Sequence, residues 1–566
     1  MKNISKLHLD YLVPIAIWLL IFQKSIFSNL LFVDYVSPTY LDIGKFIQLS
    51  NYTYVFSLFD ILKIIAAPFS LFFLLFTFSI LIAMLVSYFY IKRTFKDKPL
   101  VYSILFSLIY FFNPFVYSRI MIGQLGVLLA YLVIPVYLYY LFAFFESNQN
   151  KKSMVKLAIA FTLCSSISIH FFALNLIIFI VASFWFDNDK IKLSKYIGSI
   201  IFLVILLILL NSFWIQGFFD NKVFSTIDSD HEFFFSPKMS EHAPAVSKIL
   251  GMYGFWREIA ETVPYKQVPL YVSVIGLSIL VILMLIGYFL STSKKSKLFF
   301  TLFWIGLIFG TGISHPYTKP FFDFLFQNLP FFNGFRDSHK FVSLIALAYA
   351  YFIPITIIKL KSKIKPAYLL ILTTLMVLFI LAYTYPLIGL NNQIKPVNYP
   401  NSYDQANDYL NQQSITGHII YLPFENYLTY SWSKDSSSDG RIAVPIDQIL
   451  KEPVIVGADR WGTADEITAK VSNCISEKSI SCLEESNVQY ILYDKCAYYP
   501  ENYSFITSSS TPVYQNDCIS LYKISNLSKV KSSPVPLRFI IGVSISLITL
   551  IVLVVYLVFK RSSVFY

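Results

Sequence analysis

The sequence predicts an α-helical polytopic membrane protein with about twelve transmembrane helices and a small extracytoplasmic α/β domain near the C-terminus. Hydrophobic residues make up 56% of the 566 residues and charged residues only 14%, which is too apolar for a soluble protein of this size. Long apolar runs alternate with short polar gaps, and every second gap is basic. Because short cytoplasmic loops collect lysine and arginine, this alternation predicts the topology as well as the class.

The basic gaps occur along the whole chain, at Lys92 to Lys98, Lys151-Lys152, Lys190 to Lys195, Lys294 to Lys297, Lys359 to Lys365 and Lys560-Arg561. These gaps account for the formal net charge of +12. Binding to nucleic acid is the poorer explanation of that charge, and we exclude it. The sequence therefore predicts a multi-pass cell-membrane protein whose two termini are cytoplasmic.

A helix needs about 20 apolar residues to cross the hydrocarbon core, and fewer where other helices surround it. The first run follows only a short basic start without a small-residue cleavage site, and we expect a retained helix rather than a signal peptide. One long stretch must turn over near His170, because only a split there keeps the basic loops on one side. The spans are expected near 10–31, 67–91, 99–113, 121–145, 155–170, 171–186, 195–216, 268–290, 298–313, 340–359, 366–388 and 537–559.

These spans divide the chain into a transmembrane domain (1–389), an extracytoplasmic α/β domain (390–534) and a C-terminal helix with a basic tail (535–566). In the first outer loop, apolar residues recur at helical spacing beside charges, a pattern typical of amphipathic helices that lie in the interface plane. The outer loops of the transmembrane domain are expected at 32–66, 113–121, 217–267 and 314–339.

Within the 390–534 domain, helical patterns alternate with strand-like apolar runs, which predicts a small α/β domain. Helices are expected over Tyr403 to Leu410 and Ala464 to Ile475. Strands are expected over Gly417 to Pro423, Val488 to Tyr493 and Ile519 to Ile524.

Four of the five cysteines, Cys474, Cys482, Cys496 and Cys518, also lie in this domain. In an oxidising compartment they suggest two disulfides, and local pairing of the first two and the last two is the simplest of three connectivities. A zinc site is the rival interpretation, although the stretch lacks a C-x-x-C knuckle. Glycosylation sequons at Asn51, Asn502 and Asn526 agree with an outer location.

The strongest candidate for chemistry is Asp34, which directly follows the first span. A carboxylate at the outer membrane boundary can act as a general base on an acceptor hydroxyl or bind a metal that neutralises a phosphate leaving group. A solvated cap at the interface is the structural alternative. Asp42 is expected to cap the amphipathic helix that follows.

Basic side chains at the outer face are candidates for binding a phosphate. Arg119 stands in the second outer loop with no acid near it in sequence, and a snorkelling anchor is its structural alternative. Gln124 is a polar residue near the start of a span and faces a cavity in this interpretation. The stretch from Gly334 to Lys340 holds three cationic or titratable side chains, Arg336, His339 and Lys340, around one carboxylate.

Arg336 and Lys340 are spaced to share one helix face, where both can hold a diphosphate or a lipid phosphate. An Arg–Asp pair that caps the following helix is the alternative. In the third outer loop, His231 and Glu232 are candidate ligands, with Asp42, for a divalent cation such as Mg²⁺ or Mn²⁺. Such residues are also ordinary in a solvated loop.

Two stretches resemble a known superfamily. The stretch from Asn113-Pro114-Phe115 through Arg119 and Gly123-Gln124 to Ile134-Pro135 is similar to one in large archaeal and bacterial membrane proteins, including relatives of the mycobacterial arabinofuranosyltransferases. The stretch from Leu329-Pro330 to Lys340 resembles an "LP…GFR-P-KF" element of those proteins and of YfhO-like membrane proteins. With the acidic residue after the first span and the C-terminal outer domain, the chain resembles the GT-C superfamily of integral membrane glycosyltransferases, which take sugars from polyprenyl-phosphate carriers.

The resemblance implies that Asp34 takes the place of the catalytic base in the first loop. It also implies a lipid-linked sugar donor and a glycan, lipid or protein acceptor. Many members carry a second acidic pair in the next outer loop, whereas residues 113–121 contain none, so a metal ligand must come from Asp42 or the third loop. A flippase of lipid-linked glycan and a non-catalytic envelope protein remain the alternatives.

Overall fold

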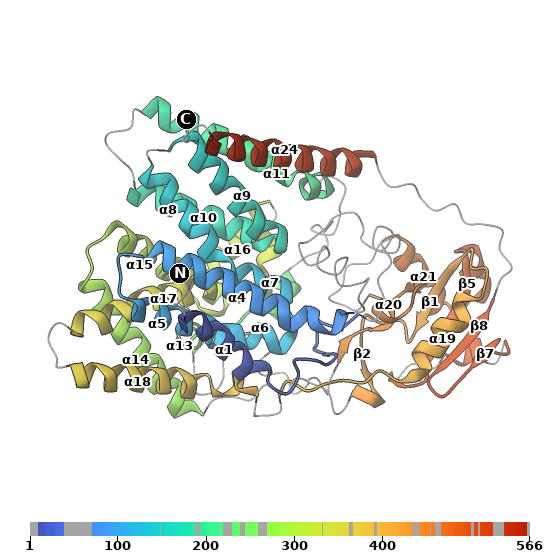
Figure 1. Cartoon of the computed structure of the whole chain (residues 1–566). Coiled ribbons are helices and arrows are strands. Elements are labelled where there is room, and N and C mark those ends of the chain that lie inside the picture. Colours follow the sequence, from blue (N-terminus) through green and yellow to red (C-terminus); the bar gives the residue numbers. More distant parts are fainter. Residues whose placement is uncertain are drawn as a thin grey trace, which may run out of the picture.

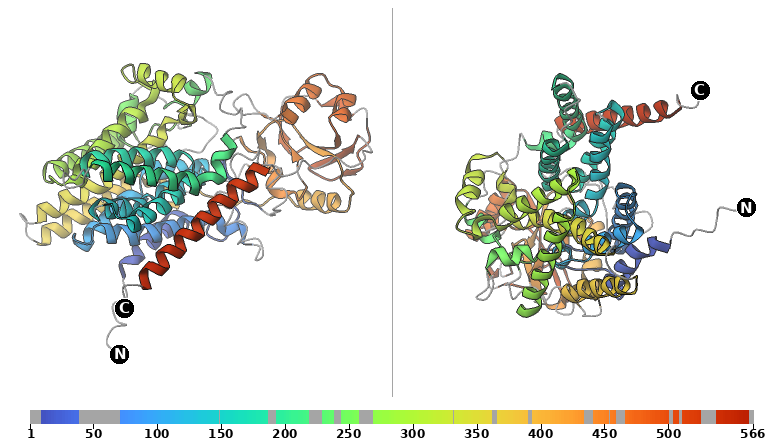
Figure 2. Two further views of the ribbon diagram at one scale, coloured as in Figure 1. Left: turned by 90° about the horizontal axis from the view of Figure 1, so that it is seen from above. Right: turned by 90° about the vertical axis from the view of Figure 1, so that its left-hand side faces the viewer.

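The computed structural model describes residues 9–38, 71–147, 149–186, 193–218, 229–237, 244–257, 269–330, 332–361, 366–389, 393–433, 441–452, 454–458, 466–499, 503–507, 510–524 and 537–562. A large group of apolar helices stands beside a smaller sheet-containing domain (Figure 1). The view from above shows the same separation, with the last helix running along the outside of the helical group (Figure 2). The predicted fold class is therefore confirmed.

Each of the twelve predicted spans coincides with one or two helices. They are α1 (Leu12–Phe22), α4 (Leu75–Thr94), α5 (Leu100–Phe111), α7 (Leu125–Leu132) with α8 (Ile134–Glu146), α9 (Lys151–Ile167), α10 (His170–Phe186), α11 (Leu193–Phe218), α14 (Leu270–Phe289), α15 (Lys294–Thr311), α17 (Val342–Lys361), α18 (Pro366–Tyr383) and α24 (Leu537–Ser562). Among the described residues, seven helical segments are long and apolar enough to cross a membrane, or eight if the bent pair α5 and α6 (Pro114–Ile122) is one span. The number twelve stays a prediction.

Several basic gaps of the sequence meet at one end of the helical group. Lys295, at the start of α15, pairs with Glu146 at the end of α8 across 3.4 Å. Close by, the Tyr351 hydroxyl lies 3.2 Å from that of Ser293, and its ring contacts that of Phe95 after α4. This clustering agrees with the expectation that the basic gaps share one side of the membrane.

The second predicted outer loop, 113–121, is wrong as a loop, because Pro114–Ile122 form helix α6, bent by 42° from α5. The Asn113 side chain accepts a hydrogen bond from the Val116 amide, and Pro114 occupies the first turn. Asn-Pro is therefore a helix start here, since proline has no amide to leave unpaired at that position. Gly123 ends the helix with φ of +83°.

The sheet domain contains a five-stranded sheet in the order β4–β1–β5–β8–β7. Strand β1 pairs in parallel with β4 and β5, whereas β8 runs antiparallel to β5 and β7. The bounds are β4 (Val454–Ile455), β1 (His418–Leu422), β5 (Val488–Asp494), β8 (Ile519–Lys523) and β7 (Tyr514–Gln515). The three predicted strands are thus confirmed, while the two short edge strands were not predicted.

Alternating residues of β1 form two apolar layers, because successive strand side chains point to opposite faces. Ile419 and Tyr421 pack with α19 (Asn401–Asn411), whereas Ile420 and Leu422 pack with α21 (Glu466–Ser476) and α22 (Ile480–Glu485). Helices α19 and α21 match the two predicted ones. The domain is therefore a helix–sheet–helix sandwich.

Both disulfides have the expected local pairing. Cys474–Cys482 joins α21 to α22, and Cys496–Cys518 joins the end of β5 to the start of β8. Cys164 is buried and free. The predicted boundary at 389/390 lies at the edge of the described residues, and the one at 534/535 lies outside them. The asparagines of all three sequons and the amphipathic helices expected beyond residue 38 also lie outside the described residues.

A second small sheet brings the sheet domain against the segment that follows α1. It contains β3 (Ile442–Ala443), β2 (Tyr427–Tyr430) and β6 (Ala497–Tyr498), paired antiparallel in that order. The Ala443 amide donates a hydrogen bond to the Val33 carbonyl at 2.8 Å. The helical group and the sheet domain therefore meet at the residue before Asp34.

Candidate functional site

Asp34 is half-buried in a short segment that lies against the junction between α6 and α7. Its amide donates a hydrogen bond of 2.7 Å to the Ile122 carbonyl. A Cβ at Gly123 would lie 2.6 Å from Tyr35 Cβ and 2.8 Å from Phe32 Cβ, so only glycine allows this approach. The left-handed turn that ends α6 thus fixes the backbone that carries Asp34.

The Asp34 carboxylate accepts hydrogen bonds from two distant parts of the chain. Gln124 Nε2 donates to Oδ2 at 3.3 Å, and the Tyr427 hydroxyl donates to Oδ1 at 3.0 Å. Gln124 comes from the helical group and Tyr427 from β2 of the outer domain. Asp34 therefore lies at the junction between the two domains and contacts both, and it is not a solvated cap.

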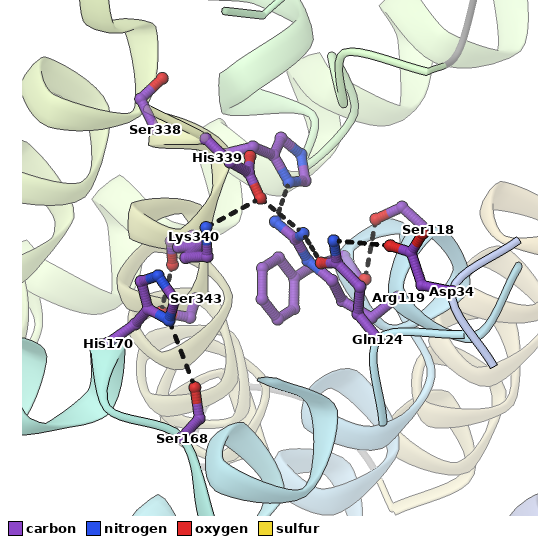
Figure 3. Close-up of polar contacts among 12 residues, drawn as sticks. Asp34, Ser118, Arg119, Gln124, Ser168, His170, Ser338, His339, Lys340 and Ser343 are labelled. Carbon is purple, nitrogen blue, oxygen red and sulfur yellow. Dashed lines mark hydrogen bonds and ion pairs between the residues drawn. The ribbon is translucent and has the colours of Figure 1, made fainter. Parts of the chain in front are cut away.

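A hydrogen-bonded row continues from Gln124 into the protein interior (Figure 3). Gln124 Oε1 accepts a hydrogen bond from Arg119 Nη1, which also pairs with Asp337 Oδ2 at 2.8 Å. Arg119 Nη2 lies 3.1 Å from His339 Nδ1. Figure 3 shows Lys340 on the opposite side of Arg119 from Asp34. Four of the residues selected from sequence, Gln124, Arg119, His339 and Lys340, thus belong to one cluster with Asp34.

Arg119 is fully buried, and its surroundings explain how a cation is tolerated there. Its guanidinium lies between the rings of Phe115 and Phe255, with centroid distances of 5.0 and 4.6 Å. Asp337 supplies the counter-charge from a position 218 residues away. The expectation that Arg119 lies in a loop without a nearby acid holds only along the sequence, because the fold supplies the acid.

Asp337 is the carboxylate shared by two cations. Lys340 Nζ lies 3.3 Å from the same Oδ2 that contacts Arg119. Burial by itself raises the pKa of the Asp337 carboxyl, but the charges of Arg119 and Lys340 outweigh burial and hold the pKa well below its usual range. Asp337 Oδ1 and Arg119 Nε are buried without a hydrogen-bond partner in the described structure. The cluster therefore retains capacity for a further polar ligand or water.

The predicted helix face shared by Arg336 and Lys340 is wrong. The chain there makes two short 3-10 turns, Phe332–Phe335 and Ser338–Phe341, and the α-helix starts only at Val342. The Arg336 guanidinium lies over the Phe235 ring at 5.0 Å, whereas Lys340 turns toward Asp337. The reason is local: the backbone between Phe332 and Phe341 is not α-helical, so residues four apart do not share a helix face there.

Aromatic and cationic side chains from the segment before α14 and from α12 (Ser229–Phe235) also lie beside the site. The Trp256 ring packs edge-on against Phe235 with centroids 4.7 Å apart. The Arg257 guanidinium lies over Trp256 at 4.5 Å and over Tyr427 at 5.6 Å. These contacts connect the ring beneath Arg336 to the tyrosine that contacts Asp34. The sequence marked Asp337 only as the carboxylate within the Gly334 to Lys340 stretch and not as the partner of Arg119. Arg257, Tyr427 and Phe255 were not predicted as site residues, because no local pattern marks them.

The candidate metal ligands do not form a metal centre within the described structure. Among these residues, no group of three or more histidine, cysteine, aspartate or glutamate side chains is placed to hold an ion. His231 and Glu232 lie on the short helix α12 (Ser229–Phe235), both buried, and Asp42 is outside the described residues. The divalent cation stays a prediction.

Glu232 has a raised pKa. Its Oε1 is buried without a hydrogen-bond partner in the described structure. Burial, and after it the nearby Asp323 carboxylate, raises the Glu232 pKa to about 7. The folded protein thus keeps a proton that the unfolded chain releases at the ordinary value of 4.5. Its stabilising contribution is complete below that value and is lost as the pH rises through 7.

We therefore expect Glu232→Gln to make the protein less sensitive to alkaline pH. The thermal unfolding midpoint of the unmodified protein should fall between about pH 5 and pH 8 by several degrees more than that of the variant, since glutamine cannot ionise. Asp230→Asn, at an exposed position of the same helix, is the control and should keep the parent pH dependence. Parallel curves for Glu232→Gln and the parent would contradict the assignment.

No family model matches the sequence, and no curated protein matches it significantly. Among solved structures, arabinofuranosyltransferase AftD from Mycobacteria aligns with a TM-score of 0.60 over 92% of this chain and 40% of that protein, at 12% identity. A mutant form of AftD aligns equally well, with 42% of its chain covered. ArnT from Cupriavidus metallidurans aligns at a TM-score of 0.37, 10% identity, over 92% of this chain and 97% of its own, too low to carry an argument.

The similarity to AftD concerns the fold, since the identity is low and this chain spans less than half the length of AftD. It extends over the helices and the outer domain together, because 92% of this chain is aligned. We conclude that this chain shares the fold of the part of arabinofuranosyltransferase AftD to which it aligns.

Proposed function

We propose that the protein is a membrane glycosyltransferase that moves a sugar from a polyprenyl-phosphate-linked donor to an acceptor hydroxyl on a glycan, lipid or protein. The observation that carries the proposal is the placement of Asp34. Its carboxylate is held by Gln124 and Tyr427 at one end of a row that leads to a buried cationic cluster. The fold similarity to an arabinofuranosyltransferase supports the same chemistry.

The reaction would take place at the extracytoplasmic face. Lys92, at the end of α4, pairs with Asp10 at the start of the chain's first helical segment across 2.5 Å. Asp34 follows the other end of α1, so these groups lie at opposite ends of that helix. Because basic ends face the cytoplasm, this arrangement supports cytoplasmic termini and an outer location for Asp34 and the sheet domain.

Asp34 would act as the general base. It would accept the proton of the acceptor hydroxyl while the hydroxyl oxygen forms a bond to the anomeric carbon of the sugar. The bond between that carbon and the phosphate oxygen would break, and the lipid phosphate would leave with the bonding electrons. The carboxylate is half-buried, so it is reachable by a substrate while two donors keep its orientation.

The basic residues would then divide into two roles. Arg336 is half-buried and Lys340 offers an ammonium with three donors, so these two are the proposed partners of the phosphate. Arg119 is completely buried, and its terminal nitrogens contact three protein groups, those of Gln124, Asp337 and His339. Lys340 is buried as well, but the ion pair that the described structure gives its ammonium is the one with Asp337. We therefore propose that Arg119 orients Gln124 and Asp337 and does not itself receive the donor.

Donor binding tests this division. Arg336→Gln should weaken the binding of a polyprenyl monophosphate to the purified protein in nanodiscs by about tenfold or more, since a hydrogen bond to a charged group contributes about 1.5–3 kcal/mol. Native mass spectrometry of the lipid titration measures the affinity. Lys319→Gln is the matched control, because Lys319 is exposed and pairs with Asp323 on α16 (Lys319–Asn328). Equal affinities of both variants and the parent would contradict the phosphate role.

A further inference from the structure

We propose that the outer sheet domain completes the active site by positioning Asp34 through Tyr427. The inference rests on the proposed function, in which Asp34 is the base. Tyr427 lies 393 residues after Asp34, yet its hydroxyl donates a hydrogen bond of 3.0 Å to the carboxylate. The domain is then a structural part of the reaction centre and not only a surface that recognises the acceptor.

The segment that carries Asp34 is held by the outer domain through its backbone. The Val397 amide donates to the Asn29 carbonyl at 3.0 Å, and the Ala443 amide donates to the Val33 carbonyl at 2.8 Å. Leu31 is a fully buried member of the apolar core of the sheet domain. The loop is therefore shared by both domains, and its geometry depends on their docking.

Tyr427 is itself held in place, both at its backbone and at its ring. Arg441 Nε and Nη2 donate to the Tyr427 carbonyl at 3.0 and 2.9 Å, which fixes the strand end. The Arg257 guanidinium lies over the ring at 5.6 Å from the third outer loop. Through Tyr427, the segments that carry Arg257, Tyr427 and Arg441 are therefore connected to Asp34 Oδ1.

The consequence for Asp34 follows from its two contacts. Without the Tyr427 hydroxyl, the carboxylate keeps, among its side-chain contacts in the described part of the chain, only the longer hydrogen bond from Gln124 at 3.3 Å. With one donor fewer, the carboxylate would be held less firmly in the orientation that the two hydrogen bonds define. Because misplacement of a reacting group costs rate and not ground-state binding, kcat should fall while the donor affinity stays unchanged.

The test compares Tyr427→Phe with Tyr499→Phe, whose hydroxyl donates to Glu425 Oε1 at 2.6 Å in the same domain. In protein labelled with ¹³C-carboxyl aspartate, the infrared band of Asp34 is the one that disappears in Asp34→Asn. Tyr427→Phe should shift the carboxylate stretch of that band, because one donor to Oδ1 is lost, while Tyr499→Phe should leave it in place. An unshifted band in folded Tyr427→Phe would overturn the inference.

Turnover supplies the second readout. Tyr427→Phe should lower kcat about tenfold with little change in the KM for the donor, and it should add nothing further in the Asp34→Asn background. Additive losses in the double variant would show that Tyr427 acts independently of Asp34 and overturn the inference. If Asp34→Asn retains full turnover, the proposed function fails, whereas the infrared comparison still decides whether Tyr427 positions the carboxylate.

Discussion

Asp34→Asn is expected to lower the rate of glycosyl transfer by about a thousandfold while leaving donor binding and folding intact. General-base catalysis contributes about 10²–10⁴ in rate, and asparagine removes the base while keeping the size of the side chain. Its amide oxygen can still accept a hydrogen bond from Tyr427, so the junction with the outer domain should persist. Transfer of labelled sugar from a polyprenyl-phosphate donor to acceptor by purified protein in nanodiscs measures the effect.

Asp10→Asn is the matched control for this experiment. Asp10 is also a partly buried carboxylate with a tyrosine partner, the Tyr88 hydroxyl at 2.9 Å, but it lies at the basic end of the helical group beside Lys92. It should retain transfer within a few fold. If cells that carry Asp34→Asn make unchanged glycan products, the base role is wrong. Movement of a lipid-linked glycan across the membrane without transfer would instead favour the flippase interpretation.

Asp337→Ala is expected to have the largest effect on stability. The substitution leaves the buried Arg119 without its counter-charge and removes the partner of Lys340. Breaking one side of a buried ion pair costs about 3–5 kcal/mol, because the remaining charge stays in an environment with little water. The variant should unfold at a clearly lower temperature, and its yield of folded protein in detergent should fall.

Asp323→Ala provides the comparison for Asp337→Ala. Asp323 pairs at 3.0 Å with Lys319, which is mostly exposed, and exposed pairs contribute about 0–1 kcal/mol. The pH response is a further check. Since the Asp337 pKa is depressed, its contribution is present above the pKa of the unfolded chain and is lost as the pH falls below it. Similar unfolding temperatures for the two alanine variants would refute the buried pair.

Local chemistry explains why much of the fold was predictable. Apolar runs and basic gaps are patterns of residues that lie next to one another in the chain. The helices at the twelve predicted spans could therefore be located from the sequence, including the break between α9 and α10 just before His170. The disulfides were predictable for the same reason, since their cysteines lie 8 and 22 residues apart. Helix α6 was missed because residues 113–121 lie between two predicted spans and were assigned to an outer loop, although Asn113 and Pro114 mark a helix start.

The sequence by itself predicted the class, the alternation of basic gaps with longer mixed-charge gaps and the main elements of the sheet domain, and it singled out Asp34 as an acid beside the first span. Only the tertiary structure decided what surrounds that acid. Asp337 reaches Arg119 across 218 residues, and Tyr427 reaches Asp34 across 393. Periodicity and charge patterns describe short stretches of chain, whereas these contacts arise only when helices and sheet pack together. The same packing pairs Lys340 with Asp337 and places Arg336 over the Phe235 ring.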